Sequence, residues 1–182
     1  TLMIFREGVL VFSQPGALPE AALYAGAVDL LNRYGLNVDY QELFDDIRQC
    51  IDEAHRDGSI VDVIANNLPR FIIRDPGLAP TLHKLRSAGK KLFLLTNSRW
   101  AYTERMMTHL LGDSLPEYSA WRNYFDLVVV AATKPAFFTE RRPFLERVFD
   151  NGVETVRPAY TLERGRIYEN GNLRDFERMI NA

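Results

Sequence analysis

The sequence lacks the marks of several protein classes. It contains one cysteine, Cys50, in 182 residues, so an internal disulfide and a multi-cysteine metal site are excluded. No secretory signal is visible, and no apolar run approaches the roughly 18 residues that span a bilayer. We therefore expect no membrane partner, and a reducing cytoplasm is the simplest setting for the chain.

The sequence also lacks a large excess of positive or negative charge. The chain has 22 Lys and Arg residues against 24 Asp and Glu residues, and neither sign dominates a long stretch. Binding to a nucleic-acid polymer needs a basic stripe, so we do not expect it. The hydrophobic fraction of 47% is ordinary for a globular protein. Cys50 lies beside Ile51 on an apolar helical face, which favours a packing role over a nucleophilic one.

The first part of the chain has a mostly helical pattern. Residues 3–12 predict two short strands that turn at Glu7-Gly8. Apolar spacing then predicts three helices, over residues 19–32, 39–56 and 61–67. We therefore expect a strand hairpin at residues 1–12 and a helical cap segment over residues 13–75.

A different pattern begins at residue 76. Helical and short apolar segments alternate, which predicts a helix at 76–89, a strand at 91–96, a helix at 102–111 and a strand at 125–132. This alternation is typical of a parallel α/β sheet. Past Lys134 the pattern weakens to short strands around Gly165 and a helix over 173–180. We therefore expect residues 76–182 to form part of an α/β core, with a small β excursion near 153–170.

Small polar residues follow the first of the two apolar strands. Thr96, Asn97 and Ser98 stand between this strand and the next predicted helix. Ligands of open α/β sheets lie at the carboxyl ends of strands, and a helix N-terminus favours anions. The three residues therefore predict a phosphate site. The alternative is that Asn97 or Ser98 simply caps the helix that follows.

The second apolar strand ends at Thr133-Lys134-Pro135. The proline restricts Lys134 to an extended conformation at the mouth of the sheet. A lysine held there can offset the negative charge of a phosphoryl group, although a solvated loop lysine is the commoner case. If the two strands are neighbours, Lys134 and residues 96–98 converge on one crevice.

Arg48, Asp52 and His55 form a third candidate group. Their spacings of four and three residues place them on one helical face. They could read a ligand from a helical cap, or they could be an exposed Arg–Asp pair beside a solvated histidine. His83 and His109 have no acidic or cysteine partners at ligand spacing, so we expect structural roles for them.

Two long runs carry a family resemblance. Residues 92–98 (LFLLTNS) and 121–130 (WRNYFDLVVV), the latter followed by Lys134-Pro135, resemble the second and third motif regions of the purine-preferring cytosolic 5′-nucleotidases. That family belongs to the haloacid dehalogenase superfamily. The helix with Arg48 is similar to the family's nucleotide-reading cap segment. Residues 165–172 resemble the stretch before its fourth motif.

The resemblance implies a partial Rossmann-like core with a helical cap, and a 5′-nucleotidase activity. The expected reaction converts IMP- or GMP-like purine nucleoside 5′-monophosphates to nucleoside and phosphate through an aspartyl-phosphate, with Mg²⁺ as cofactor. The resemblance assigns catalytic roles to Lys134, Thr96 and Ser98. It assigns substrate binding to Asn97, Arg48, Asp52 and His55.

The family's catalytic aspartates are missing from the sequence. Neither the Asp-x-Asp-x-Thr motif, which holds the nucleophile, nor the Asp-rich fourth motif, which completes the magnesium site, is found. We therefore expect an internal fragment of a longer enzyme, with the nucleophile and the main Mg²⁺ ligands outside this chain. A non-catalytic nucleotide-binding or regulatory protein and a phosphatase for another small phosphate ester are the alternatives. A homo-oligomer is compatible with all of these.

Overall fold

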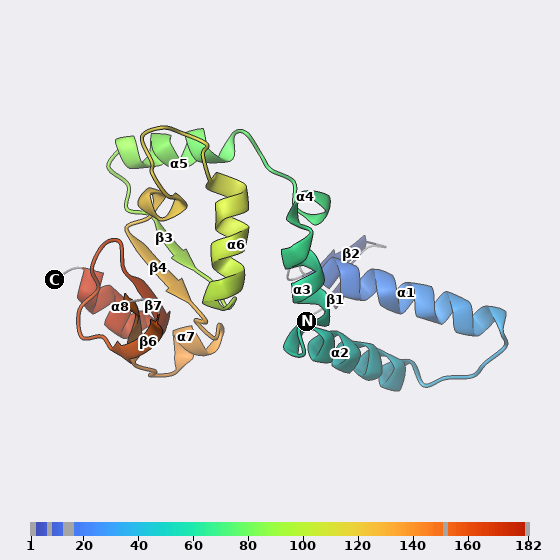
Figure 1. Cartoon of the computed structure of the whole chain (residues 1–182). Helices are drawn as coiled ribbons and strands as arrows, with labels where there is room; N and C mark the ends of the chain where they lie inside the picture. The colour runs from blue at the N-terminus through green and yellow to red at the C-terminus, as the bar shows by residue number, and fades with distance from the viewer. Residues whose placement is uncertain (1–2, 7–8, 13–16, 151–152, 181–182) are drawn as a thin grey trace. The chain divides into compact units, whose positions relative to one another are not determined.

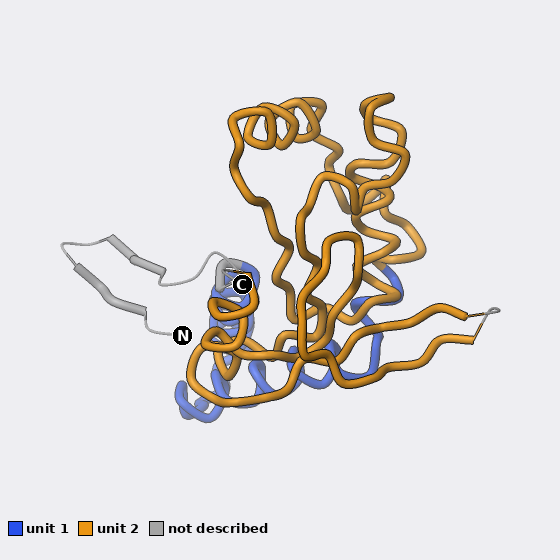
Figure 2. Tube along the Cα trace, turned by 90° about the vertical axis from the view of Figure 1, so that its left-hand side faces the viewer, with its two compact units in different colours: residues 1–63 blue, residues 64–182 orange. Residues whose placement is uncertain are grey.

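The computed structural model describes residues 3–6, 9–12, 17–150 and 153–180. The chain divides into two compact units, Thr1–Val63 and Ile64–Ala182, which we call the first and second units and describe separately (Figure 2). Within the described ranges, no helix combines the length and the apolar character that crossing a membrane requires.

The first unit holds a strand pair and a helix pair. Strands β1 (Met3–Arg6) and β2 (Val9–Phe12) pair antiparallel, which confirms the two predicted strands. The predicted turn at Glu7-Gly8 lies outside the described residues. Three helices follow, close to their predicted positions: α1 (Ala17–Arg33), α2 (Tyr40–Arg56) and α3 (Ser59–Asn66), the last of which runs past the unit boundary.

Local hydrogen bonds explain where α1 ends and where α2 begins. Gly35, with φ +66°, follows α1, and Leu36 N–H donates to Leu31 O at 3.0 Å. That pattern closes a helix with a residue in the left-handed region, which glycine adopts without steric cost. Asp39 caps α2 by accepting from the backbone N–H groups of Gln41 at 2.8 Å and Glu42 at 3.1 Å.

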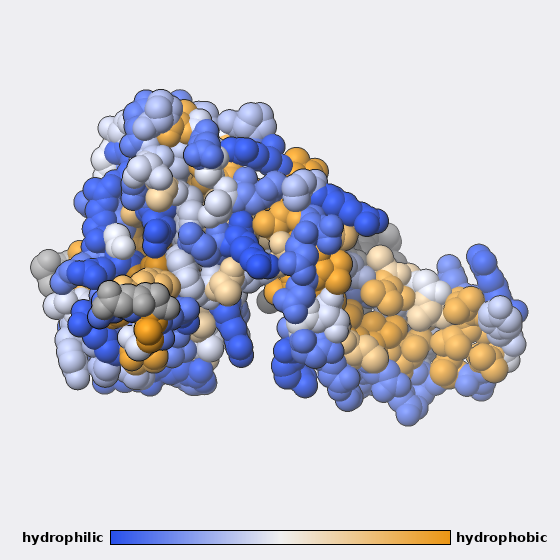
Figure 3. Space-filling view, viewed as in Figure 1, coloured by the Kyte–Doolittle hydropathy of each residue, from blue (hydrophilic) through white to orange (hydrophobic). Residues whose placement is uncertain are grey.

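In the part of the chain that the structure describes, helix α2 packs along one narrow strip. Its half-buried side chains are Leu43, Phe44, Ile47, Ile51 and Ala54. Cys50 lies beside this strip and is exposed, so the predicted packing role of its side chain is wrong. Apolar side chains also remain exposed over the α1–α2 pair (Figure 3), among them Leu23, Leu30, Tyr34 and Leu36. Two helices cover only one strip of each other, so apolar residues outside that strip stay exposed.

The turn between α2 and α3 contains a carboxyl with a lowered pKa. Asp57 accepts from the Ser59 hydroxyl at 2.5 Å and from the Ser59 N–H at 2.8 Å. These bonds, the hydroxyl bond first, hold the pKa of Asp57 below its ordinary value of 3.8. We expect Ser59→Ala to raise this pKa towards the ordinary value, measured by NMR titration of the carboxyl carbon.

The sign of the pH effect follows from the lowered pKa. The stabilisation of the turn is present above pH 3.8 and is lost as the pH falls through the lower value of the folded state. The exposed Ser119, in the second unit, gives the control variant Ser119→Ala, which should leave the Asp57 titration unchanged. An identical Asp57 midpoint in the wild-type chain and Ser59→Ala would contradict the assignment.

The second unit is built on a five-stranded sheet with the order β3-β4-β7-β5-β6. Its strands are β3 (Phe93–Leu95), β4 (Leu127–Val130), β5 (Phe144–Asp150), β6 (Val153–Pro158) and β7 (Ile167–Asn170). Strands β3, β4 and β7 are parallel neighbours, while β5 pairs antiparallel with β7 and β6. The expected α/β class with a partial Rossmann-like core is confirmed. The sequence pattern missed β5.

Helices cover both faces of this sheet. Val128, Val130 and Ile167 face one core with α5 and α6, and Leu127 and Val129 face another with α7 and α8. Figure 1 shows α6 and α8 on opposite sides of β3 and β4. Burial on both faces explains the apolar run of β4. The helices that follow α3 in the chain are α4 (Leu68–Phe71), α5 (Leu78–Ser87), α6 (Trp100–Leu111), η1 (Trp121–Tyr124), α7 (Ala136–Thr139) and α8 (Leu173–Ile180).

The β5–β6 ribbon extends from the rest of the second unit (Figure 2). All six residues of β6 are exposed. Ion pairs join the two strands of the ribbon: Arg147 contacts Glu154, and Arg157 contacts Glu146 at 2.7 Å. Arg147 also contacts Glu169 of β7 at 2.6 Å, which connects the ribbon to the rest of the sheet. Charged side chains on an edge strand discourage pairing with other chains.

Candidate phosphate-binding site

The ends of β3 and β4 lie side by side. Leu95 stands opposite Val129 in the parallel register. Beyond the strands, Ala132 N–H donates to Thr96 O and Ala131 N–H donates to Ser98 O, both at 2.9 Å. The two segments that the sequence predicted to converge are therefore joined by backbone hydrogen bonds.

Asn97 and Lys134 form a reciprocal contact between these segments, which we call the Asn97–Lys134 lock. Lys134 N–H donates to Asn97 Oδ1 at 2.6 Å, and Asn97 Nδ2 donates to Lys134 O at 2.9 Å. The Lys134 ammonium is held as well, since its Nζ donates to Leu95 O at 2.9 Å. An ammonium has three protons, and among the described residues one acceptor is seen for them, so two can donate to a ligand. Lys134 is thus a half-buried, anchored cation rather than a solvated loop lysine.

The N-terminus of α6 adds a favourable field for an anion. Its capping position is Arg99, and in the described part of the chain no side chain caps the helix. Asn97 and Ser98 therefore do not act as caps here, because Asn97 bonds Lys134 instead. Free N–H groups and the helix dipole at Trp100 attract negative charge.

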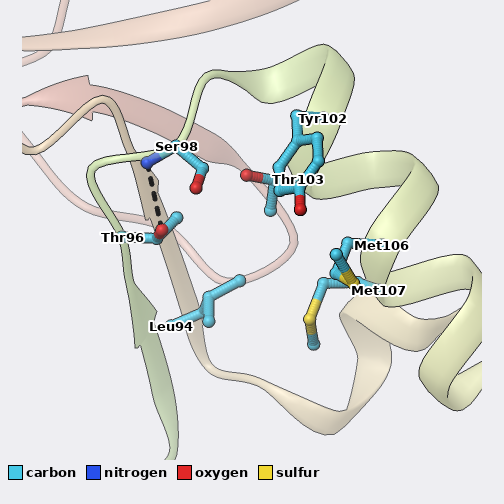
Figure 4. A pocket seen from close by; sticks show the side chains of 7 residues that line it. All are labelled: Leu94, Thr96, Ser98, Tyr102, Thr103, Met106 and Met107. Carbon is cyan, nitrogen blue, oxygen red and sulfur yellow. Dashed lines mark hydrogen bonds between the residues drawn. The ribbon is translucent and has the colours of Figure 1, made fainter. Parts of the chain in front are cut away.

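A small pocket of about 80 Å³ lies between the end of β3 and α6 (Figure 4). Four residues with hydroxyl groups line it, Thr96, Ser98, Tyr102 and Thr103, together with the apolar residues Leu94, Met106 and Met107. Thr96 Oγ1 accepts from Ser98 N–H at 3.1 Å, which the dashed line in Figure 4 marks. Burial raises the pKa of Tyr102 above 10.0, so its phenol stays protonated near neutral pH and can donate a hydrogen bond.

Sequence reasoning did not single out Tyr102 and Thr103 as site residues. Thr103 is the fourth residue of α6, so its side chain lies within the first turn behind Ser98. A hydroxyl in the first turn after a strand end was the signal available in the sequence. Arg142 was also missed: its guanidinium donates to Thr133 Oγ1 at 3.3 Å, next to Lys134, and forms an ion pair with Glu140 at 2.8 Å.

The first unit carries the other predicted site residues. Arg48, Asp52 and His55 are exposed on α2. Arg48 contacts Glu20 of α1 at 3.6 Å, and His55 Nδ1 lies 2.8 Å from Ile51 O. These three residues lie on one helix, as predicted. Thr96, Asn97, Ser98 and Lys134 lie together in the second unit. The roles assigned to all seven residues stay predictions.

His83 and His109 make hydrogen bonds within the second unit. His83 Nδ1 lies 3.0 Å from the Tyr118 hydroxyl, and His109 Nε2 lies 3.3 Å from Ile72 O. These contacts link helices to neighbouring loops. Among the described residues, no group of three or more His, Cys, Asp or Glu side chains could hold a metal ion. The described residues alone therefore do not fit a Mg²⁺ site.

Comparison with known proteins gives the family. A model of the 5′ nucleotidase family matches residues 7–182. The chain is 35% identical over 163 residues to 5′-nucleotidase domain-containing protein 2 of Rattus norvegicus, covering 90% of this chain and 28% of the relative. The Homo sapiens protein of the same name is 34% identical over 163 residues, covering 90% and 30%.

A third relative lies farther away. A 5′-nucleotidase domain-containing protein of Dictyostelium discoideum is 32% identical over 160 residues, covering 87% of this chain and 27% of the relative. The chain spans less than a third of the length of these relatives. The match nevertheless includes both strand ends that form the phosphate site, residues 96–98 and Lys134. The chain belongs to the 5′ nucleotidase family.

Proposed function

We propose that this chain supplies the phosphate-binding wall of a 5′-nucleotidase that hydrolyses purine nucleoside 5′-monophosphates of the IMP or GMP type. One observation carries the proposal: the Asn97–Lys134 lock places an anchored ammonium at the ends of two parallel strands, beside hydroxyls and the N-terminus of α6. Membership of the 5′ nucleotidase family supports the reaction type.

Each residue of the site has a chemical task in this proposal. The two remaining Lys134 N–H groups donate to phosphoryl oxygens and offset the charge that grows during attack on phosphorus. The hydroxyls of Thr96 and Ser98 bind further phosphoryl oxygens. Asn97 fixes the Lys134 backbone and keeps one amide proton for the substrate. Arg48, Asp52 and His55 orient the nucleoside.

The bond-breaking step needs a nucleophile from outside this chain. An Asp carboxylate forms the new O–P bond, the P–O5′ bond breaks, and the nucleoside oxygen takes up a proton. Water then hydrolyses the aspartyl-phosphate and regenerates the carboxylate. The ligands of the Mg²⁺ cofactor would also come from polypeptide outside this chain. We propose that the enzyme is cytoplasmic.

Phosphate release from IMP tests the proposal. We expect the isolated 182-residue chain to release no phosphate in the presence of Mg²⁺, because it lacks the nucleophile. A longer polypeptide that contains this sequence and an upstream Asp-x-Asp-x-Thr motif should release phosphate from IMP and GMP. Faster release from sugar phosphates would overturn the substrate class, and nucleotide binding without any release would favour a regulatory protein.

A further inference from the structure

The first turn of α6 contains a buried hydroxyl that has no hydrogen-bond partner among the described residues. Thr103 is 4% exposed, and its Oγ1 is buried. Its backbone N–H bonds Arg99 O at 3.0 Å. Threonines inside helices usually bond a carbonyl one turn back through their hydroxyl. Thr103 does not, and a buried hydroxyl without a partner is unfavourable.

The pocket that Thr103 lines suits a small ligand with a polar and an apolar end. Its volume of about 80 Å³ is well below the roughly 300–1,000 Å³ that encloses a drug-sized molecule. The hydroxyls of Thr96, Ser98 and Thr103 lie towards the strand end, and Leu94 and Met106 form apolar wall (Figure 4). A phosphoryl group with its ester carbon fits this size, whereas a whole nucleotide does not.

Charge favours the same occupant. None of the side chains that line the pocket is a carboxylate. The N-terminus of α6 lies at its rim, and Lys134 is bonded to the carbonyl of Leu95, one residue before the lining residue Thr96. An anion in the pocket would therefore lie in positive potential and beside residues that carry hydroxyl groups.

We propose that Thr103 is a further phosphate-contacting residue: its hydroxyl donates to a phosphoryl oxygen held in this pocket, together with the Ser98 hydroxyl. Leu94 and Met106 then pack against the ester carbon. This assignment rests on the proposed function and adds to it. In this arrangement, the pocket between the end of β3 and α6 holds the phosphoryl end of the substrate, and the nucleoside lies outside the pocket.

The test compares variants of this chain in their affinity for inorganic phosphate and methyl phosphate, followed by NMR titration. Thr103→Val keeps the branched shape but removes the hydroxyl, and it should weaken binding by about tenfold or more. Thr103→Ser restores the hydroxyl and should bind within about threefold of the wild-type chain. Thr108→Val, an exposed threonine on the same helix and outside the pocket, should bind like the wild-type chain.

A thermal melt without phosphate separates ligand contact from a structural role. Thr103→Val replaces an unpaired hydroxyl by a methyl group, so its Tm should equal or exceed that of the wild-type chain. Equal phosphate affinity of Thr103→Val and the wild-type chain would overturn the assignment of Thr103, while the Lys134 site would stand if Lys134→Ala still weakened binding. No phosphate binding by the wild-type chain would overturn both proposals.

Discussion

Lys134→Ala should weaken the binding of inorganic phosphate to this chain by about tenfold to a hundredfold, measured by isothermal titration calorimetry. A hydrogen bond between two charged groups contributes about 1.5–3 kcal/mol, which corresponds to that range. The substitution removes the ammonium but keeps the lock, because Asn97 bonds the backbone N–H and carbonyl of Lys134. The arrangement of the two strand ends should therefore survive.

Lys91→Ala provides the matched control for charge. Lys91 is exposed and lies just before β3, at the opposite end of the strand from Thr96. The Lys91→Ala substitution removes the same charge as Lys134→Ala and should leave the phosphate affinity within about twofold of the wild-type value. Equal losses in the two variants would show that net charge, rather than the position of Lys134, governs binding. An unchanged affinity in Lys134→Ala would remove Lys134 from the site.

Gly171→Ala should lower the free energy of unfolding of the second unit by about 3 kcal/mol or more. Gly171 has φ +87°, and a Cβ atom at this position would overlap the ring of Phe144. Phe144 is 1% exposed in the core beneath α7 and α8, so its ring has little room to move. Urea titration followed by tryptophan fluorescence measures the effect, since Trp100 and Trp121 both lie in the second unit.

Gly165→Ala separates backbone strain from overlap. Gly165 has a similar φ of +81°, but a methyl group at this position would have no described atom within 4 Å apart from its immediate chain neighbours. This variant should lose only the cost of the left-handed conformation, about 1 kcal/mol. The difference between the two variants then reports the overlap with Phe144. If both variants lose the same stability, the ring of Phe144 moves aside and the packing argument is wrong.

The sequence was sufficient for the parts of the fold where apolar spacing is regular. Strands β3 and β4 and helix α8 lie where the pattern predicted them. Strand β5 was missed because Glu146 and Arg147 interrupt its apolar run. Glu146 is buried all the same, since Arg157 and Arg166 contact it at 2.7 Å and 3.4 Å. Partners from β6 and the following loop are remote in sequence, so the spacing within β5 cannot reveal them.

The candidate site also has parts that the sequence predicted and parts that it could not predict. The strand ends at Thr96 and Lys134 were predictable, because parallel neighbours bring their carboxyl ends to one edge. The reciprocal bonds of Asn97 were not, since they depend on the conformation of two loops that are 37 residues apart. Thr103 gave a weak signal, because only the folded pocket shows that its hydroxyl is buried and unbonded within the described structure.

The Asn97–Lys134 lock has a consequence for the thermodynamics of binding. Two loops that are tied through both polar groups of one amide side chain move together, and the ammonium is anchored to a strand carbonyl. A ligand therefore meets donors whose rotamers are already restricted, and little conformational entropy is lost when it binds. Folding, rather than the arrival of the ligand, orders this edge of the sheet.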